Sequence, residues 1–176
     1  FIDGLNTINL GYYFLIGLII LYLNLNQLIT LNNMPIEYFL IFLFSVLILN
    51  LLNKVYLGDS GSYLVGFSFS VFLINIYNWN NHISPFFIVL LLWYPCYETL
   101  FSIIRKNILR KSPLSPDSNH LHQLIYSFIK RNYKQSTLGA NLISAQIINV
   151  YNLIIFLIAM NFVSNSAIQV LSLIHI

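Results

Sequence analysis

The segment VYLGDSGSYLVGF, Val55–Phe67, places Asp59 among two glycines and two serines, with apolar sequence on both sides. Only 7% of the 176 residues are charged, 58% are hydrophobic, and the mean hydropathy is +0.77. A soluble domain has about a quarter of its residues charged, so the composition predicts an integral membrane protein. A carboxylate next to hydrocarbon is costly and usually has a function. Asp59 is therefore the first candidate functional residue.

Apolar segments long enough to cross a bilayer recur along the chain. A membrane-spanning helix needs about 20 mostly apolar residues. Five segments meet this need: 8–29, 37–53, 62–78, 85–104 and 138–162. A further apolar run, from Ala167 to Ile176, is too short to span. We therefore expect an all-α fold, a polytopic transmembrane helix bundle that forms a single integral-membrane domain over residues 1–176.

Positive charge predicts which ends of these spans lie together. All eight lysines and arginines occur at Lys54 or between Arg105 and Lys134. By the positive-inside rule both places are cytoplasmic, and the two spans between them return the chain to the same side. Counting backwards from Lys54 brings Asp3 to that side as well. The sequence thus predicts a site at one cytoplasmic face, built from Asp3, Asp59 and the 105–137 segment.

The Gly58-Asp59-Ser60-Gly61-Ser62 motif has features of a phosphate and metal site. Glycine permits a positive φ at the start of a helix, and free N–H groups and hydroxyls there suit phosphate oxygens. Asp59 offers the hard oxygen ligand that magnesium prefers. The alternative is a plain helix N-cap at Asp59 or Ser60. Chymotrypsin-like and rhomboid serine proteases share some of these letters, but no histidine lies inside a predicted span.

The basic segment Arg105–Lys134 suits an anionic substrate. It begins with four cations that could bind a diphosphate: Arg105, Lys106, Arg110 and Lys111. A helix is predicted from Asp117 or Ser118, with an apolar stripe at 121, 124, 125, 128 and 129, and is expected to lie amphipathically on the cytoplasmic membrane surface. The alternative for these cations is contact with anionic lipid.

Two histidines, an acidic residue within a predicted span and the start of the chain complete the set of candidate site residues. His120 and His122 fall about 200° apart on a helical wheel, so a regular helix would not direct both at one metal. They could equally be a pair of solvated side chains. Glu98 lies near the cytoplasmic end of its span, where it could serve a function, pair with Arg105 or reach toward water. At the start of the chain, Asp3 and Asn6 precede a span, and capping is again the alternative.

Taken in order, three motifs resemble one family. D-G-L-N before a span, K-V-Y-L-G-D-S-G-S before another, and S-P-L-S-P-D-S-N-H-L-H in a basic loop are similar to the polyprenyl-phosphate N-acetylhexosamine-1-phosphate transferases, the undecaprenyl-phosphate GlcNAc-1-phosphate transferase type of glycosyltransferase family 4. The resemblance covers about Phe1 to Ile129. It implies transfer of a sugar phosphate from a UDP-N-acetylhexosamine to undecaprenyl phosphate or a similar lipid, with release of UMP.

The resemblance also implies a setting and partners. The enzyme would lie in the bacterial cytoplasmic membrane, with its active site facing the cytoplasm, and begin a cell-wall or lipopolysaccharide pathway. Its metal would be Mg²⁺, or Mn²⁺ in its place. It would have no nucleic-acid partner, and a homodimer is left open.

Residue roles follow from the same resemblance. Asp59 would be catalytic and bind the metal, and His120 and His122 would be catalytic. Substrate would be bound by Asp3, Asn6, Gly58, Ser60, Arg105, Lys106, Arg110 and Lys111.

The chain also departs from the family pattern. Gln123 stands where the family has a third histidine, and Ser118 where it often has arginine. The family's aspartate-rich loop is missing, so we expect a C-terminal part that is inactive alone, with residues 171–176 not native. The alternative function is a transporter or lipid-binding subunit in which Asp59 and Glu98 line a pathway.

Overall fold

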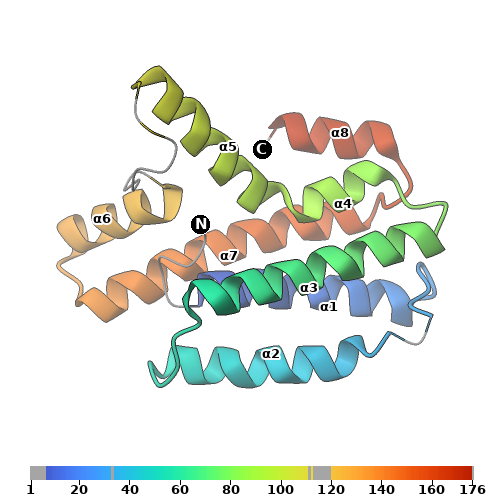
Figure 1. Cartoon of the computed structure of the whole chain (residues 1–176), viewed down its shortest axis with the longest axis horizontal. Coiled ribbons are helices and arrows are strands. Elements are labelled where there is room, and N and C mark those ends of the chain that lie inside the picture. Colours follow the sequence, from blue (N-terminus) through green and yellow to red (C-terminus); the bar gives the residue numbers. More distant parts are fainter. Residues whose placement is uncertain (1–6, 33, 111, 113–119, 176) are drawn as a thin grey trace.

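The computed structural model describes residues 7–32, 34–110, 112 and 120–175, and within them the chain is helical without strands. The predicted site residues Asp3, Asn6 and Lys111 lie outside this part. The helices are α1 Ile8–Leu25, α2 Ile36–Leu51, α3 Gly58–Trp79, α4 Pro85–Leu91, α5 Trp93–Ile108, α6 Leu121–Tyr133, α7 Thr137–Met160 and α8 Ser166–His175 (Figure 1). The expected all-α membrane bundle is confirmed.

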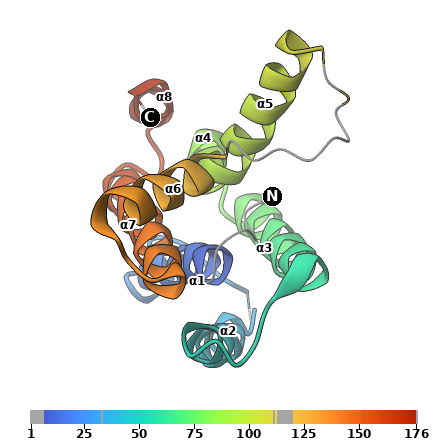
Figure 2. The ribbon, with the colours of Figure 1, turned by 90° about the vertical axis from the view of Figure 1, so that its left-hand side faces the viewer.

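Helix α1 lies at the centre of the bundle and contacts α2, α3 and α7 (Figure 2). The start of α1, the end of α2 and the starts of α3 and α7 lie at one end, on the left of Figure 1. Helix α6 packs against α7 at that end. The structure thus brings together the helix ends that the charge pattern assigned to one face.

Among the described residues, fewer helices than the five predicted are long enough to span a membrane. In that part of the chain, α1, α3 and α7 are long and apolar enough, and α4 with α5 makes a fourth if this bent pair is one span. Helix α2 is apolar but has only 16 residues. The span predicted over 85–104 is not one regular helix, since α4 and α5 meet at a bend of 72°.

Pro95 explains this bend. A proline has no N–H, so it cannot bond to the carbonyl four residues earlier, and its ring clashes with that carbonyl. The carbonyl in question belongs to Leu91, the last residue of α4. It accepts instead a hydrogen bond of 2.7 Å from the Tyr12 hydroxyl of α1. The bend therefore costs no unsatisfied carbonyl, and it directs α5 away from the bundle axis (Figure 2).

Aromatic packing holds Tyr12 in place for this bond. Its ring is fully buried and lies 5.6 Å from that of Phe156 on α7 and 6.0 Å from that of Tyr94 on α5. Tilted aromatic pairs at such distances stabilise cores beyond their buried area. The same residue therefore packs α1 against α7 and satisfies the broken helix.

We predict that Tyr12→Phe destabilises the protein by about 1–3 kcal/mol, because it leaves the buried Leu91 carbonyl without a donor. Tyr22→Phe, on the same helix but half exposed, is the matched control and should cost little. Adding Pro95→Ala to Tyr12→Phe restores an N–H and should recover part of the loss. Thermal unfolding in detergent measures all three, and equal midpoints for the two single variants would contradict this account.

Candidate functional site at the bundle end

The Gly58–Ser62 motif forms the first turn of α3, as expected. Gly58 has φ +64°, the left-handed conformation that glycine favours, and α3 begins there. The capping alternative is not what the structure has, since Leu57 is the N-cap and no side chain caps the helix. Asp59 and Ser60 are exposed. Within the described residues the Asp59 carboxylate has no hydrogen bond or ion pair, so it is available to a ligand.

Glu98 lies at the centre of the histidine region. Its carboxylate is buried, with Oε2 2.7 Å from Nδ1 of His120, and Oε1 accepts a 2.9 Å hydrogen bond from the N–H of Leu121. Leu121 is the first residue of α6, whose free N–H groups favour a carboxylate. An ionised carboxylate can only accept, so Nδ1 carries the proton and Nε2 faces away from Glu98. Glu98 therefore anchors α6 to α5 and sets the orientation of His120.

The two histidines are closer than the helical wheel predicted. Their rings stack with centroids 5.5 Å apart and an interplanar angle of 4°. The prediction failed because His120 is not helical: it is the N-cap of α6, with extended backbone at φ −69° and ψ 150°. Both are buried rather than solvated. Burial, with a smaller contribution from the neighbouring His120, lowers the pKa of His122 to about 4.

Helix α6 begins at Leu121, and the expected start at Asp117 or Ser118 lies outside the described residues. The start is set by Glu98 and by Gln123, whose Oε1 accepts a bond of 3.3 Å from the His120 N–H. The glutamine that replaces the family's third histidine thus caps this turn. Of the predicted apolar stripe, Ile129 is buried, whereas Leu124 and Phe128 are about half exposed. That α6 contacts the membrane surface stays a prediction.

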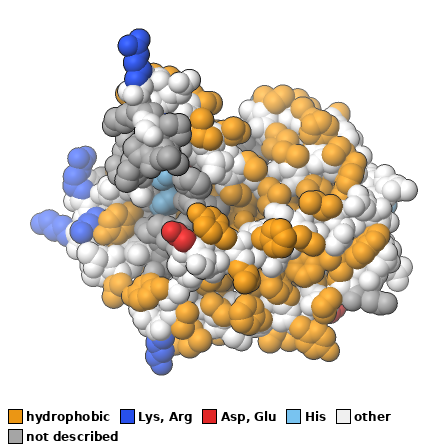
Figure 3. All heavy atoms as spheres, in the orientation of Figure 1, with side chains coloured by type: hydrophobic (Ala, Val, Ile, Leu, Met, Phe, Trp, Pro, Cys, Tyr) orange, Lys and Arg blue, Asp and Glu red, His pale blue; other side chains and the backbone are white. Residues whose placement is uncertain are grey.

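The described basic residues at the end of α5 lie in different environments. Lys106 is buried, the Arg105 guanidinium lies 5.3 Å from the Phe101 ring centroid, and Arg110 is exposed. In Figure 3 the lysine and arginine side chains are spread over the left side of the molecule, with histidine and an acidic side chain between them. Glu98, Ser102 and Lys106 are buried at intervals of four, which places them on one face of α5. The spacing of four residues is visible in the sequence, but Ser102 was not predicted as a site residue.

Magnesium fits this end through Asp59 alone among the described residues. No group of three His, Cys, Asp or Glu side chains that could hold a metal occurs in the described part of the chain. Mg²⁺ commonly takes one or two carboxylates and completes its shell with water and substrate phosphate. The exposed and unpaired Asp59 carboxylate suits that mode.

A small cavity that the sequence did not predict lies beside Ser62, and its mainly apolar lining carries a few polar side chains. It has a volume of about 210 Å³, and Asn9, Ser62 and Thr99 are among its lining residues. Two buried side-chain atoms here, the Ser62 hydroxyl and the side-chain Oδ1 of Asn9, have no hydrogen-bond partner within the described residues. Because Ser62 lies one helical turn after Asp59, the cavity adds hydrogen-bonding capacity next to the candidate site.

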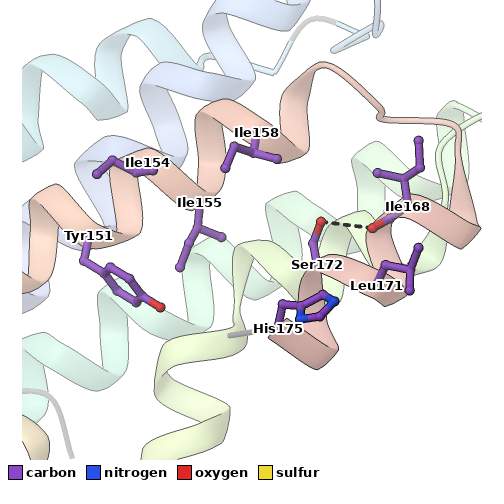
Figure 4. Close-up of a pocket in the computed structure, with 8 residues that line it drawn as sticks. All are labelled: Tyr151, Ile154, Ile155, Ile158, Ile168, Leu171, Ser172 and His175. Carbon is purple, nitrogen blue, oxygen red and sulfur yellow. Dashed lines mark hydrogen bonds between the residues drawn. The ribbon is translucent and has the colours of Figure 1, made fainter.

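A larger cavity of about 370 Å³ lies elsewhere, between α7 and α8. Figure 4 shows its lining, which is mainly isoleucine and leucine with Tyr151, Ser172 and His175. None of the predicted site residues lines it. Its apolar walls do not suit a diphosphate.

Comparison with known proteins gives partial matches. A probable undecaprenyl-phosphate N-acetylglucosaminyl 1-phosphate transferase of Bacillus subtilis is 36% identical over 77 residues, 43% of this chain and 21% of that protein. An undecaprenyl-phosphate alpha-N-acetylglucosaminyl 1-phosphate transferase of Thermotoga maritima is 35% identical over 71 residues, 40% of this chain and 23% of that protein. Over these stretches the chain is similar to proteins named as polyprenyl-phosphate N-acetylglucosaminyl 1-phosphate transferases.

A third match, a decaprenyl-phosphate N-acetylglucosaminephosphotransferase of Mycolicibacterium smegmatis, is 35% identical over 81 residues, 39% of this chain and 20% of that protein. The chain thus spans about a fifth of the length of these curated transferases. No protein-family model and no solved structure matches it. The relatives named here are enzymes, which does not favour the transporter alternative.

We predict that Glu98→Ala frees the start of α6, because it removes the acceptor for both Leu121 and His120. Loss of hydrogen bonds to a charged group costs about 1.5–3 kcal/mol. Hydrogen exchange across residues 120–133 should therefore accelerate roughly tenfold or more. Glu98→Gln keeps one carbonyl acceptor and should have a smaller effect. Unchanged exchange in Glu98→Ala would show that α6 is held by its contacts with α7 alone.

A pH dependence follows from His122. Because its folded-state pKa lies near 4, below the ordinary 6.5, the folded protein keeps this histidine neutral. The contribution of this neutral histidine to the free energy of unfolding is complete above about pH 6.5, and it is lost as the pH falls toward 4. We expect His122→Gln to flatten the dependence of the thermal midpoint on pH in this window. The exposed His82, replaced by Gln, is the control, and an identical slope in both variants would count against the assignment.

Proposed function

We propose that the complete protein transfers the sugar 1-phosphate of a UDP-N-acetylhexosamine to a polyprenyl phosphate, with release of UMP, at the cytoplasmic face of the membrane. The observation that carries the proposal is the gathering of the G-D-S-G-S turn, the His120–Glu98 pair and the basic end of α5 at one end of the bundle. The names of the similar proteins supply the reaction class. A bacterial cytoplasmic membrane and a role in cell-surface glycan synthesis are part of the same proposal.

Each group has a role suited to its environment. Asp59, exposed at the first turn of α3, would hold Mg²⁺, which when bound neutralises charge on the diphosphate. Gly58 and Ser60 present backbone N–H groups and a hydroxyl at a helix start, where phosphate oxygens bind well. Asp3 and Asn6 would bind the nucleotide. Binding both substrates at one membrane face converts their encounter into a positioned reaction.

The basic and histidine side chains act on the transferred phosphoryl group. The lipid phosphate attacks the β-phosphorus of the UDP-sugar, a P–O bond forms there, and the bond to the UMP oxygen breaks. Arg105, Lys106, Arg110 and Lys111 supply positive charge, which stabilises the oxygens that gain negative charge in the transition state. His120 offers Nε2 to a phosphate oxygen, while Glu98 fixes the ring. The His122 ring stacks on the His120 ring and holds it in its orientation.

The test uses the complete gene product in membranes. We expect Asp59→Asn to reduce release of UMP from UDP-N-acetylhexosamines by at least a hundredfold, because the substitution removes the charged metal ligand. Glu37→Gln is the matched control, since Glu37 is also an exposed carboxylate in the first turn of a span-like helix but lies at the opposite end. Release should require both polyprenyl phosphate and magnesium. Full turnover in Asp59→Asn would overturn the metal assignment, and no release by the unaltered protein would overturn the reaction.

A further inference from the structure

Asn50, the penultimate residue of α2, connects two parts of the chain that each adjoin a predicted substrate-binding motif. Its Oδ1 accepts a hydrogen bond of 2.6 Å from the N–H of Thr7, and its Nδ2 donates one of 2.8 Å to the carbonyl of Val55. Thr7 follows directly on the D-G-L-N motif, and Val55 precedes Asp59 by four residues. One buried side chain therefore bonds to both backbones.

Thr7 is held in a conformation that it would not adopt on its own. It has φ 70° and ψ −10°, in the left-handed region, where a β-branched residue is strained. Helix α7 adds two further bonds: Asn149 Nδ2 donates to the Thr7 carbonyl at 3.3 Å, and Gln146 Nε2 to its hydroxyl at 3.4 Å. Such strain persists only where the surroundings over-determine it. Asn50 makes the shortest of these contacts.

The surroundings of this link leave little room for adjustment. Asn50, Thr7 and Asn149 are each 5% exposed or less. A Cβ atom on Gly11 would collide with the Asn149 side chain, so α1 and α7 meet closely beside Thr7. Buried amide groups pay a large penalty if either bond is lost. The link is thus both short and costly to break.

We infer that Asn50 is a positioning residue, which fixes the chain after the D-G-L-N motif against the chain before Asp59. This inference rests on the proposed function. The two motifs would bind the two parts of one substrate, the nucleoside and the metal-bound diphosphate, so their spacing must match the UDP-sugar. A misplacement of about 1 Å can cost a hundredfold in rate. Asn50 sets this spacing through backbone atoms and need not touch the substrate.

The chain contains a matched control, Asn80. It is also buried, at 3% exposure, and also connects two segments. Its Oδ1 accepts a hydrogen bond of 2.7 Å from the N–H of Thr30, and its Nδ2 donates one of 2.7 Å to the carbonyl of Ile76. It lies at the other end of the bundle, next to the end of α3. Asn80→Ala should therefore lower stability as Asn50→Ala does, without altering substrate binding.

The experiment measures UMP release by the complete protein as a function of UDP-N-acetylhexosamine and of magnesium. For Asn50→Ala we expect the KM for the UDP-sugar and the magnesium concentration for half-maximal activity both to rise roughly tenfold or more, as for groups that orient metal ligands. Asn80→Ala should leave both near the unaltered values at a similar loss of thermal stability. Asn50→Asp keeps the acceptor for Thr7 but loses the donor to Val55, so it should impair magnesium activation more than KM.

A second readout does not depend on turnover. Hydrogen exchange should accelerate in Asn50→Ala in two separate peptides, around residues 7–11 and 52–60, and not in the peptide around residue 30. Acceleration in only one of the two, or unchanged KM and magnesium dependence in an active Asn50→Ala protein, would overturn the inference. If the unaltered protein releases no UMP, the proposed function fails, and the exchange experiment still decides whether Asn50 couples the two segments.

Discussion

Because Pro95 has no N–H, α4 and α5 cannot form one regular helix, and the position of the candidate site follows from this break. Pro95 breaks the fourth apolar segment at Leu92, and the Tyr12 hydroxyl compensates by bonding to the Leu91 carbonyl. A buried carbonyl without a donor costs about 1–3 kcal/mol, so the bend requires a donor from a neighbouring helix. With the bend in place, α5 leaves the bundle axis and carries Glu98 to the start of α6.

Buried polar side chains then specify how the segments meet. Apolar surfaces of membrane helices gain little from choosing one neighbour over another, because lipid tails are equally apolar. A buried carboxylate or amide has few acceptable partners, and it therefore selects one arrangement. Glu98 selects the start of α6, and Asn50 selects the relation between Thr7 and Val55. The polar residues that make up a small part of this chain thus determine the geometry of its candidate site.

Sequence-based prediction succeeded where neighbouring residues decide the structure and failed where a contact between helices decides it. Gly58 was expected to adopt a positive φ and does, because a local motif decides a local conformation. The 85–104 segment was predicted as one membrane span, and hydropathy gave no sign of the bend, because it does not record where a proline break is compensated. The histidines were placed on opposite sides of a regular helix, whereas His120 is an N-cap stabilised by Glu98, 22 residues earlier. Glu98 could be picked out as an unusual acid, but its partner depended on a contact between helices.

The order of the amino acids was enough to predict a helical membrane protein, the helix ends that share a face, and the motifs that resemble those of the polyprenyl-phosphate transferases. These conclusions need only composition, charge and short-range spacing, which are properties of contiguous residues. The packing of the helices was needed to see that α5 turns away from the bundle, that Glu98 orients His120, and that Asn50 joins two separate segments. Each of these depends on a buried hydrogen bond between residues far apart in the chain, and no local pattern specifies which donor meets which acceptor.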